Sequence, residues 1–214
     1  MSTITALRAA KRTTERVNLF LDGRFTFSLE KDDVVRQKLE VGLELSQEKL
    51  AELTDAMQMG RCLDAAYRLL GYRPRSESEV RTRLQRRGFP PEHIAAAIGK
   101  LKERGLLDDR EFARFWVENR AAFRPRSRGL TRSELLKKGV AEDAIRDVVS
   151  DMDETDAANR AAAIKARRLS GLEYREFRQR LGDFLRRRGF TYETIDRAVK
   201  HAWEERKKED VPSP

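Results

Sequence analysis

The chain of 214 residues contains one cysteine and two histidines. A single cysteine, Cys62, excludes an internal disulfide and is typical of proteins in the reducing cytoplasm. A lone cysteine also cannot build a zinc site of the usual kind. We expect Cys62 to be a packing residue of the helix that precedes the repeats. His93 and His201 have no partner at metal-ligand spacing. We therefore predict no metal site, and we expect His93 to be an ordinary surface residue.

Signals for catalysis and for membrane insertion are also missing. No apolar run reaches the roughly 18 residues that a transmembrane helix needs. The glycines lie at expected helix ends, not in a phosphate-binding loop. Asp108 and Asp109 directly precede an apolar-periodic segment, which favours helix capping over metal binding or general-base chemistry. The sequence predicts a soluble cytoplasmic protein that is not an enzyme, binds no cofactor and has no membrane contact.

Apolar residues are scarce for the length, at 39% against 38% charged residues. This balance fits a thin array of helices better than a thick globule. The net charge of +9 is uneven: residues 1–59 carry −1, residues 60–150 carry +8 and residues 151–214 carry +2. These charges either form a solvated, ion-paired surface or include a face that binds nucleic acid or an acidic protein.

The chain does contain a unit that occurs three times. Each copy has a leucine, a glycine and two β-branched residues at fixed offsets, and the glycines Gly88, Gly139 and Gly189 are 51 and 50 residues apart. Between the first two copies the match extends upstream, because Tyr72-Arg-Pro-Arg-Ser76 becomes Phe123-Arg-Pro-Arg-Ser127. A period of this size indicates a duplicated supersecondary unit whose copies share a core with their neighbours.

Local signals divide each unit into three helices. In the first copy, Ser76 and Glu79 have the spacing of a capping box, which begins the second helix. Gly88 lies where a helix end requires a left-handed residue, and Pro90-Pro91 begins the third helix. The sequence thus predicts a mainly α fold, namely a tandem array of three three-helix repeats, elongated and curved.

A different pattern precedes the repeats. Apolar residues alternate over 17–21 and 25–29 on both sides of Asp22-Gly23, which predicts a β-hairpin. A second alternating run at 39–45 predicts a further strand or extended edge, with a short helix before it. The predicted domains are a small hairpin-containing domain at 1–59, repeats at 60–108, 109–152 and 153–204, and a disordered tail at 205–214.

Basic residues are the candidate contacts. Proline holds the Arg-Pro-Arg loops extended, so we expect their guanidinium groups to project toward a partner. Basic residues before each glycine stop could instead complement the helix dipole. The predicted contact residues belong to the first two repeats, and the third repeat, which lacks the loop, extends or caps the array. They are Arg73, Arg75, Arg81, Arg86, Arg87, Arg124, Arg126, Arg128, Arg132, Lys137 and Lys138.

Several of these motifs together carry a family resemblance. The segments 67–80, 84–89 and 105–113, together with Arg124-Pro-Arg126 and 133–139, resemble the RecX regulatory proteins of bacteria. The resemblance covers about 60–205, and the third repeat matches more loosely. The hairpin-containing segment is similar to that of the longer family members.

This resemblance implies a negative regulator of the RecA recombinase that would modulate DNA repair and the SOS response. Such a protein lies in the helical groove of the RecA–DNA filament and inhibits filament extension, ATP hydrolysis and strand exchange. We expect a monomer whose partners are the RecA filament and single- or double-stranded DNA. Two alternatives remain open at this stage: a direct DNA-binding or architectural helical-repeat protein, and a helical scaffold with no nucleic-acid role.

Overall fold

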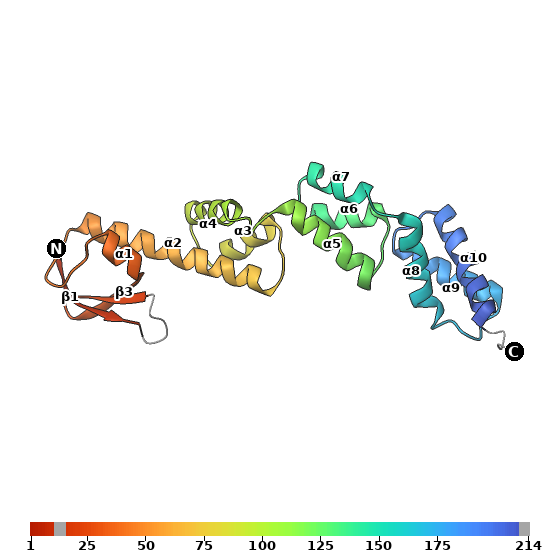
Figure 1. Ribbon diagram of the computed structural model, residues 1–214, viewed down its shortest axis with the longest axis horizontal. Helices are drawn as coiled ribbons and strands as arrows, with labels where there is room; N and C mark the ends of the chain where they lie inside the picture. Colours follow the sequence, from red (N-terminus) through yellow and green to blue (C-terminus); the bar gives the residue numbers. More distant parts are fainter. Residues whose placement is uncertain (11–15, 210–214) are drawn as a thin grey trace. The chain divides into compact units, whose positions relative to one another are not determined.

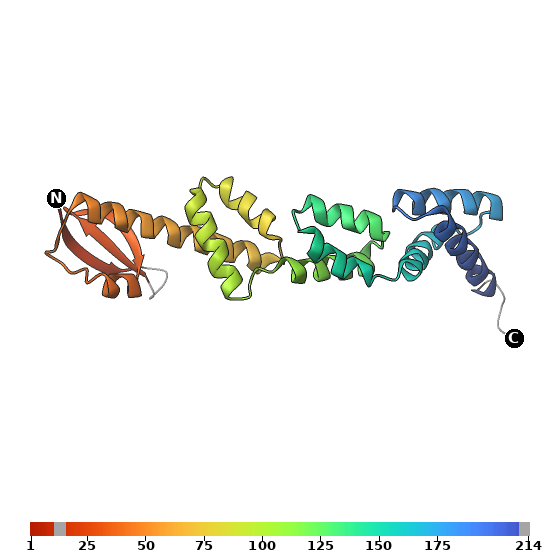
Figure 2. The same ribbon diagram turned by 90° about the horizontal axis from the view of Figure 1, so that it is seen from above.

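A computed structural model describes residues 1–10 and 16–209 of the chain. Within this part, the chain forms a small antiparallel sheet and ten helices, of which nine follow the last strand (Figures 1 and 2). The chain forms two compact units, Met1–Tyr72 with Arg81–Glu103, and Arg73–Val80 with Arg104–Pro214. The division therefore passes through one helix, between Val80 and Arg81. The residues of the first Arg-Pro-Arg loop belong to the second unit.

The sheet has four strands in the order β3-β2-β1-β4, all paired antiparallel. They are β1 Ser2–Ala9, β2 Arg16–Leu21, β3 Arg24–Glu30 and β4 Glu44–Leu45. The predicted hairpin is confirmed, since β2 and β3 meet at Asp22 and Gly23, whose φ angles are 48° and 77°. Positive φ at both positions is what a tight hairpin turn requires.

A short helix and the beginning of a long one cover this sheet. The predicted short helix is α1, Lys31–Arg36. The alternating run at 39–45 contributes only the two residues of β4, so it is an edge and not a full strand. Ile4, Leu19, Leu29 and Leu53 are fully buried at the centre of this core, the last of them on the following helix α2.

Helix α2, Gln47–Tyr72, runs without a break through the predicted domain boundary at residue 59. Gly60 does not interrupt it, because a single glycine in a helix interior costs only about 1 kcal/mol. Cys62 is fully buried on this helix, as expected. Burial raises the pKa of its thiol.

The remaining helices complete three successive three-helix repeats, α2–α4, α5–α7 and α8–α10, so the predicted mainly α fold of three three-helix repeats is confirmed. Gly88, Gly139 and Gly189 follow the second helix of each repeat with φ angles of 79°, 74° and 86°. The helices are α3 Glu77–Gln85, α4 Pro91–Glu103, α5 Asp109–Phe123, α6 Arg128–Lys137, α7 Glu142–Ser150, α8 Glu154–Ala166, α9 Tyr174–Arg187 and α10 Tyr192–Glu209.

The expectation of a disordered tail from residue 205 is wrong for its first part. Helix α10 continues to Glu209, and residues 210–214 lie outside the described part of the chain. An ion pair between Glu205 and Lys208, one helical turn apart, supports this last turn at 2.7 Å.

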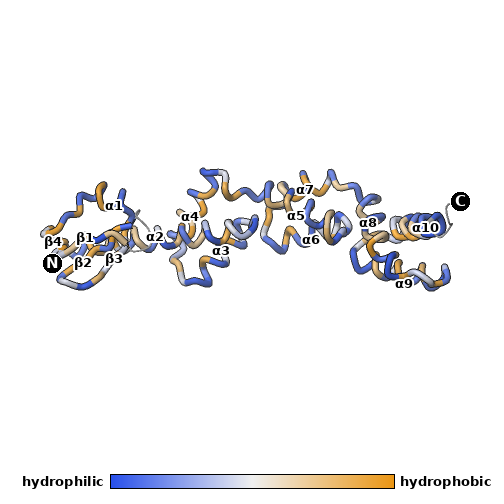
Figure 3. Tube along the Cα trace, turned by 60° about the horizontal axis from the view of Figure 1, so that its bottom comes forward, coloured by the Kyte–Doolittle hydropathy of each residue, from blue (hydrophilic) through white to orange (hydrophobic). Residues whose placement is uncertain are grey.

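The second and third repeats each have a small apolar core. Figure 3 shows hydrophobic and hydrophilic residues alternating along the helices instead of gathering in one segment. In the second repeat, Phe112, Leu135 and Ile145 are buried together, and in the third repeat Phe177 and Leu185 occupy the centre. Phe112 and, partly buried against it, Trp116 thus belong to the core of the second repeat.

Candidate partner-binding surface and the joints between repeats

The first Arg-Pro-Arg loop is held by the end of a helix in the next repeat. Ser76 follows this loop and is completely buried. Its Oγ accepts a hydrogen bond from the backbone N–H of Glu79 at 3.2 Å and donates one to the carbonyl oxygen of Lys138 at 2.6 Å. One hydroxyl therefore caps the beginning of α3 and the end of α6 together.

Two further contacts complete this arrangement. The carboxylate of Asp109 accepts a hydrogen bond from the backbone N–H of Glu77 at 2.8 Å. Gly139 lies so close that a Cβ atom there would come within 2.4 Å of the Ser78 Cβ. We call the contacts of 73–79 with 109 and 138–139 the first joint.

The second Arg-Pro-Arg loop makes the same connection one repeat later. The backbone N–H of Ser127 donates to the carbonyl oxygen of Arg188 at 3.0 Å, and the Arg188 guanidinium donates to the carbonyl oxygen of Pro125 at 2.8 Å. The Ser127 Oγ accepts from the backbone N–H of Leu130 at 3.2 Å, and a Cβ on Gly189 would lie 2.5 Å from this oxygen. We call the contacts of 125–130 with 188–189 the second joint.

A small ion network strengthens the first joint. Both terminal nitrogens of Arg73 donate to the carboxylate of Glu79 at 3.1 Å, and the Lys138 ammonium donates to it at 2.8 Å. Burial opposes the ionisation of Glu79, but these hydrogen bonds and charges outweigh it and lower the pKa of its carboxyl to about 2. The Lys138 ammonium also lies 4.4 Å from the centroid of the Trp116 ring.

The second joint relies on different charges. The carboxylate of Glu134 accepts hydrogen bonds from Arg126, from Arg120 Nε at 2.7 Å and from Trp116 Nε1 at 3.0 Å. Arg188 lies over the ring of Phe184, 4.5 Å from its centroid. Burial, together with the charges of Arg126 and Arg124, lowers the pKa of the Arg188 guanidinium.

The predicted contact residues thus divide into two groups. The engaged group makes contacts within the protein itself: Arg73, Arg126 and Lys138 in the joints, Arg128 on the Met152 carbonyl, Arg132 on Glu142, and Arg75 and Arg81 with partners of their own. The exposed group makes no side-chain hydrogen bond or ion pair within the described residues and consists of Arg86, Arg87, Arg124 and Lys137.

The expectation that the loop arginines project freely is therefore wrong for Arg73 and Arg126, which hold carboxylates of their own chain. The reason is the docking of each loop onto a helix end far along the sequence, which brings Glu79 and Glu134 within reach. Sequence reasoning did not find Ser76 and Ser127 as joint residues. Their signals were their position directly after both loops and, for Ser76, the capping-box spacing to Glu79, whose backbone N–H does donate to the Ser76 Oγ.

His93 is a second correction. It is 5% exposed, and its Nε2 lies 2.8 Å from a carboxylate oxygen of Asp55 on α2. The side chain is buried because α4 packs against α2 along this face. The signal was available, since His93 precedes Ala97 and Leu101 at intervals of four residues on the buried side of the helix.

Asp108 caps α5 as predicted, since its carboxylate accepts from the backbone N–H groups of Arg110 and Glu111 at 2.7 and 3.3 Å. In the described part of the chain, no group of three or more His, Cys, Asp or Glu side chains is placed to hold a metal ion. None of the described helices has the length and apolar character needed to cross a bilayer.

Known protein families account for nearly the whole chain. The RecX N-terminal domain model matches residues 2–46, and the models of the first, second and third RecX three-helix domains match 62–101, 108–149 and 153–199. The Regulatory protein RecX of Clostridium botulinum (strain Eklund 17B) is 30% identical over 207 residues, covering 94% of this chain and 97% of that protein. This chain belongs to the RecX family. The Regulatory protein RecX of Bacillus pumilus is 32% identical, covering 99% of this chain and 82% of that protein.

Solved RecX structures share the fold. A crystal structure of regulatory protein RecX superposes with a TM-score of 0.70 at 25% identity, covering 92% of this chain and 98% of that one. RecX from Lactobacillus salivarius gives a TM-score of 0.57 at 22% identity over 68% of this chain, which shows a likeness of fold. The resemblance inferred from the motifs is confirmed. Each joint connects stretches that match two different RecX three-helix domains.

Proposed function

We propose that this chain is a non-enzymatic, monomeric regulator of the RecA recombinase in the bacterial cytoplasm. In this proposal it binds in the helical groove of the RecA–DNA filament and inhibits filament extension, ATP hydrolysis and strand exchange, thereby modulating DNA repair and the SOS response. The observation that carries the proposal is membership of the RecX family along the chain, from the N-terminal domain to the third repeat.

Exposed charge at equivalent positions supports this proposal. Arg86, Lys137 and Arg187 each lie two residues before the glycine that ends the second helix of their repeat. All three are exposed, with no side-chain partner among the described residues. One cation at the same position of each repeat suits a polymer that offers the same acidic or phosphate group on successive subunits.

The residue directly before the glycine has different contacts in the first repeat than in the other two. Lys138 and Arg188 are engaged in the joints, whereas Arg87 is exposed and belongs to neither joint. Arg87 and Arg124 therefore join Arg86, Lys137 and Arg187 as the residues that we assign to the partner. The engaged arginines of the loops hold the protein together instead.

The test is inhibition of RecA. Wild-type protein in stoichiometric excess should suppress RecA ATP hydrolysis on single-stranded DNA and strand exchange. Charge reversal at the three equivalent positions, R86E/K137E/R187E, should weaken this inhibition by tenfold or more, because three partner contacts become repulsive. A matched control, R24E/K100E/R146E, changes the net charge equally at exposed positions outside this set and should inhibit like the wild type. Unchanged RecA ATP hydrolysis and strand exchange in the presence of the wild-type protein would contradict the proposal.

Direct DNA binding is the second candidate, favoured by the net charge of +8 over residues 60–150. A protein that contacts phosphates must lose affinity steeply with salt. Binding to naked duplex and single-stranded DNA should therefore be titrated against salt with and without RecA. Tight, salt-sensitive binding in the absence of RecA, with no effect on the filament, would favour the second candidate.

A further inference from the structure

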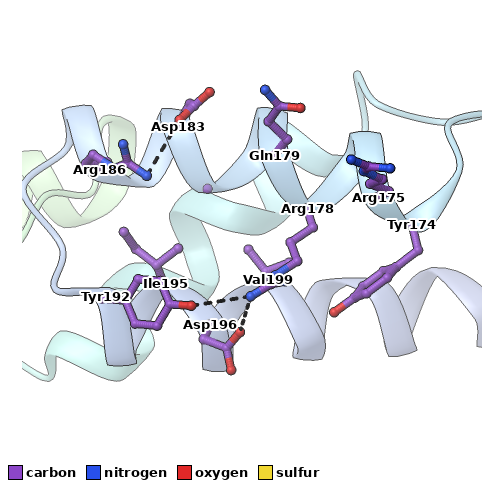
Figure 4. A pocket seen from close by; sticks show the side chains of 11 residues that line it. Tyr174, Arg175, Arg178, Gln179, Asp183, Arg186, Tyr192, Ile195, Asp196 and Val199 are labelled. Carbon is purple, nitrogen blue, oxygen red and sulfur yellow. Dashed lines mark hydrogen bonds and ion pairs between the residues drawn. The ribbon is translucent and has the colours of Figure 1, made fainter.

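The third repeat carries an open groove. It lies between α9 and α10 and has a volume of about 410 Å³. Tyr174 and Tyr192 lie at its two ends, and Arg178 extends from α9 across to α10 between them (Figure 4). Ile195 and Val199 supply its apolar lining. This size is within the range of pockets that hold small organic ligands.

Two substitutions between the repeats explain why the groove is open. By repeat alignment, Gly182 and Tyr192 correspond to Arg132 and Glu142 in the second repeat. There, the Arg132 guanidinium and the Glu142 carboxylate form an ion pair at 2.8 Å across α6 and α7. In the third repeat, Gly182 has no side chain, and the nearest atom to a Cβ built there is a methyl carbon of Ile195 at 3.7 Å.

Folding does not require this glycine. A Cβ at 3.7 Å from its nearest neighbour makes an ordinary contact, and the φ of Gly182 is not in the left-handed region. Alanine in a helix interior is more stable than glycine by about 0.5–1 kcal/mol. The position therefore carries a residue that lowers helix stability and keeps the groove open.

The rim combines aromatic rings with loosely held guanidinium groups. Tyr192 is 74% exposed, and Tyr174, at 36%, lies against Trp203 with ring centroids 5.2 Å apart. Arg178 contacts the Tyr192 hydroxyl and the Asp196 carboxylate, both at 3.4 Å (Figure 4). Long, exposed contacts of this kind contribute little energy, so Arg178 can turn to a stronger acceptor.

The charge around the groove is positive. Arg175 has no side-chain partner among the described residues, and Arg186 is 3.8 Å from Asp183. Asp196 is already paired with Lys200 at 2.8 Å. Arg175, Arg178, Arg186 and Lys200 thus outnumber the two aspartates, so the groove favours an anion.

We propose that the α9–α10 groove of the third repeat binds single-stranded nucleic acid, with a base stacked on Tyr192 and the adjoining phosphates held by Arg175, Arg178 and Arg186. Exposed aromatic rings beside a basic track are how proteins bind single strands without sequence preference. An acidic peptide would use the arginines but not the tyrosine faces. The groove therefore favours a nucleic acid over a peptide. This proposal does not depend on RecA regulation.

The test uses the full chain without RecA and a fluorescein-labelled oligothymidylate, followed by fluorescence anisotropy. The variant G182R/Y192E installs the ion pair of the second repeat, fills the groove and leaves the net charge unchanged. It should weaken binding by about tenfold or more, the size expected for loss of a stacked base. Tyr192→Ala should weaken binding to a similar extent. It serves as the test variant if circular dichroism shows that the double variant is unfolded.

Arg197→Gln is the control, because Arg197 is exposed on α10, pairs with Glu193 and does not line the groove. It removes a positive charge and should weaken binding by less than about threefold. Wild-type affinity in both groove variants, or an equal loss in the control, would overturn the proposal. Displacement of the oligonucleotide by polyglutamate as effectively as by unlabelled oligothymidylate would overturn it in favour of an acidic peptide.

A parallel assay of RecA ATP hydrolysis separates this site from the proposed function. A groove variant that has lost oligonucleotide binding but still inhibits RecA supports the groove and leaves RecA regulation intact. A wild-type protein that binds the oligonucleotide but leaves RecA unaffected also supports the groove, and contradicts only the regulatory proposal.

Discussion

The two joints share a backbone design but differ in their charges. In both, a serine after Arg-Pro-Arg caps a helix and meets the residue before a left-handed glycine of the next repeat. The first joint adds a carboxylate, Glu79, between two cations, whereas the second uses an arginine that donates to a backbone carbonyl. Glycine is common to both because a Cβ there would overlap a serine of the preceding repeat. Serine is common to both because its hydroxyl caps the helix that follows the loop. The charged residues can differ because they lie beside the serine–glycine contact and do not form it.

This comparison also shows what the Arg-Pro-Arg loops contact. In each of the first two repeats, the loop and the serine after it bond to the end of the second helix of the following repeat. Conversely, Gly88 in the first repeat has nothing within 4 Å of a Cβ built on it, whereas Gly139 and Gly189 are covered by serines. The loop is therefore a connection between repeats.

The largest expected effect concerns the covered glycines. Gly139→Ala should lower the free energy of unfolding by about 3 kcal/mol, because alanine combines left-handed strain with overlap at Ser78. Gly88→Ala should cost about 1 kcal/mol, since it carries only the strain. Urea denaturation followed by circular dichroism measures both. Equal losses at the two positions would show that the first joint does not exclude a side chain.

The serines should separate the two joints. Ser76→Ala removes a helix cap and leaves the Lys138 carbonyl without its hydroxyl donor, so we expect a loss of about 2 kcal/mol. Ser127→Ala should cost about 1 kcal/mol, because the bond to Arg188 comes from its backbone N–H and survives. Urea denaturation again gives the comparison, and a larger loss at Ser127 than at Ser76 would contradict it.

The ion network of the first joint predicts a pH dependence. The carboxyl of Glu79 has a folded-state pKa of about 2 against an ordinary value of 4.5. Its contribution to stability is therefore complete above pH 4.5 and is lost as the pH falls toward 2. Because the side chain is partly solvated, we expect about 1–2 kcal/mol. Stability curves from pH 7 to about pH 2 should flatten in Glu79→Gln, while the exposed control Glu118→Gln should keep the wild-type slope.

The smallest effect distinguishes engaged from exposed arginines. Arg73→Gln should lower the unfolding free energy by at most about 1 kcal/mol, because its pair with Glu79 is partly exposed. Arg124→Gln should leave it unchanged and instead weaken the inhibition of RecA. Thermal unfolding and the ATP hydrolysis assay, run on the same two variants, provide both readouts. A destabilised Arg124→Gln protein with normal inhibition would reverse the assignment.

Much of the fold could be predicted because its signals are local. Asp22-Gly23 determines the hairpin through backbone conformation alone, and Gly88, Gly139 and Gly189 end helices for the same reason. The boundary at residue 59 was wrong because α2 is held on both sides of Gly60 by buried residues, Leu53 before it and Cys62 after it. The composition changes at residue 59, but helix α2 continues through it.

The sequence by itself determined the three repeats, their helices, the hairpin and the RecX family, because periodicity and turn chemistry act within a few residues. Only the tertiary structure decided what the basic residues do. The acceptor for Ser76 lies 62 residues away, and the carboxylate near His93 lies 38 residues away. No local pattern encodes such pairs, since they depend on how helices pack. The same packing leaves Arg86, Lys137 and the α9–α10 groove open to a partner.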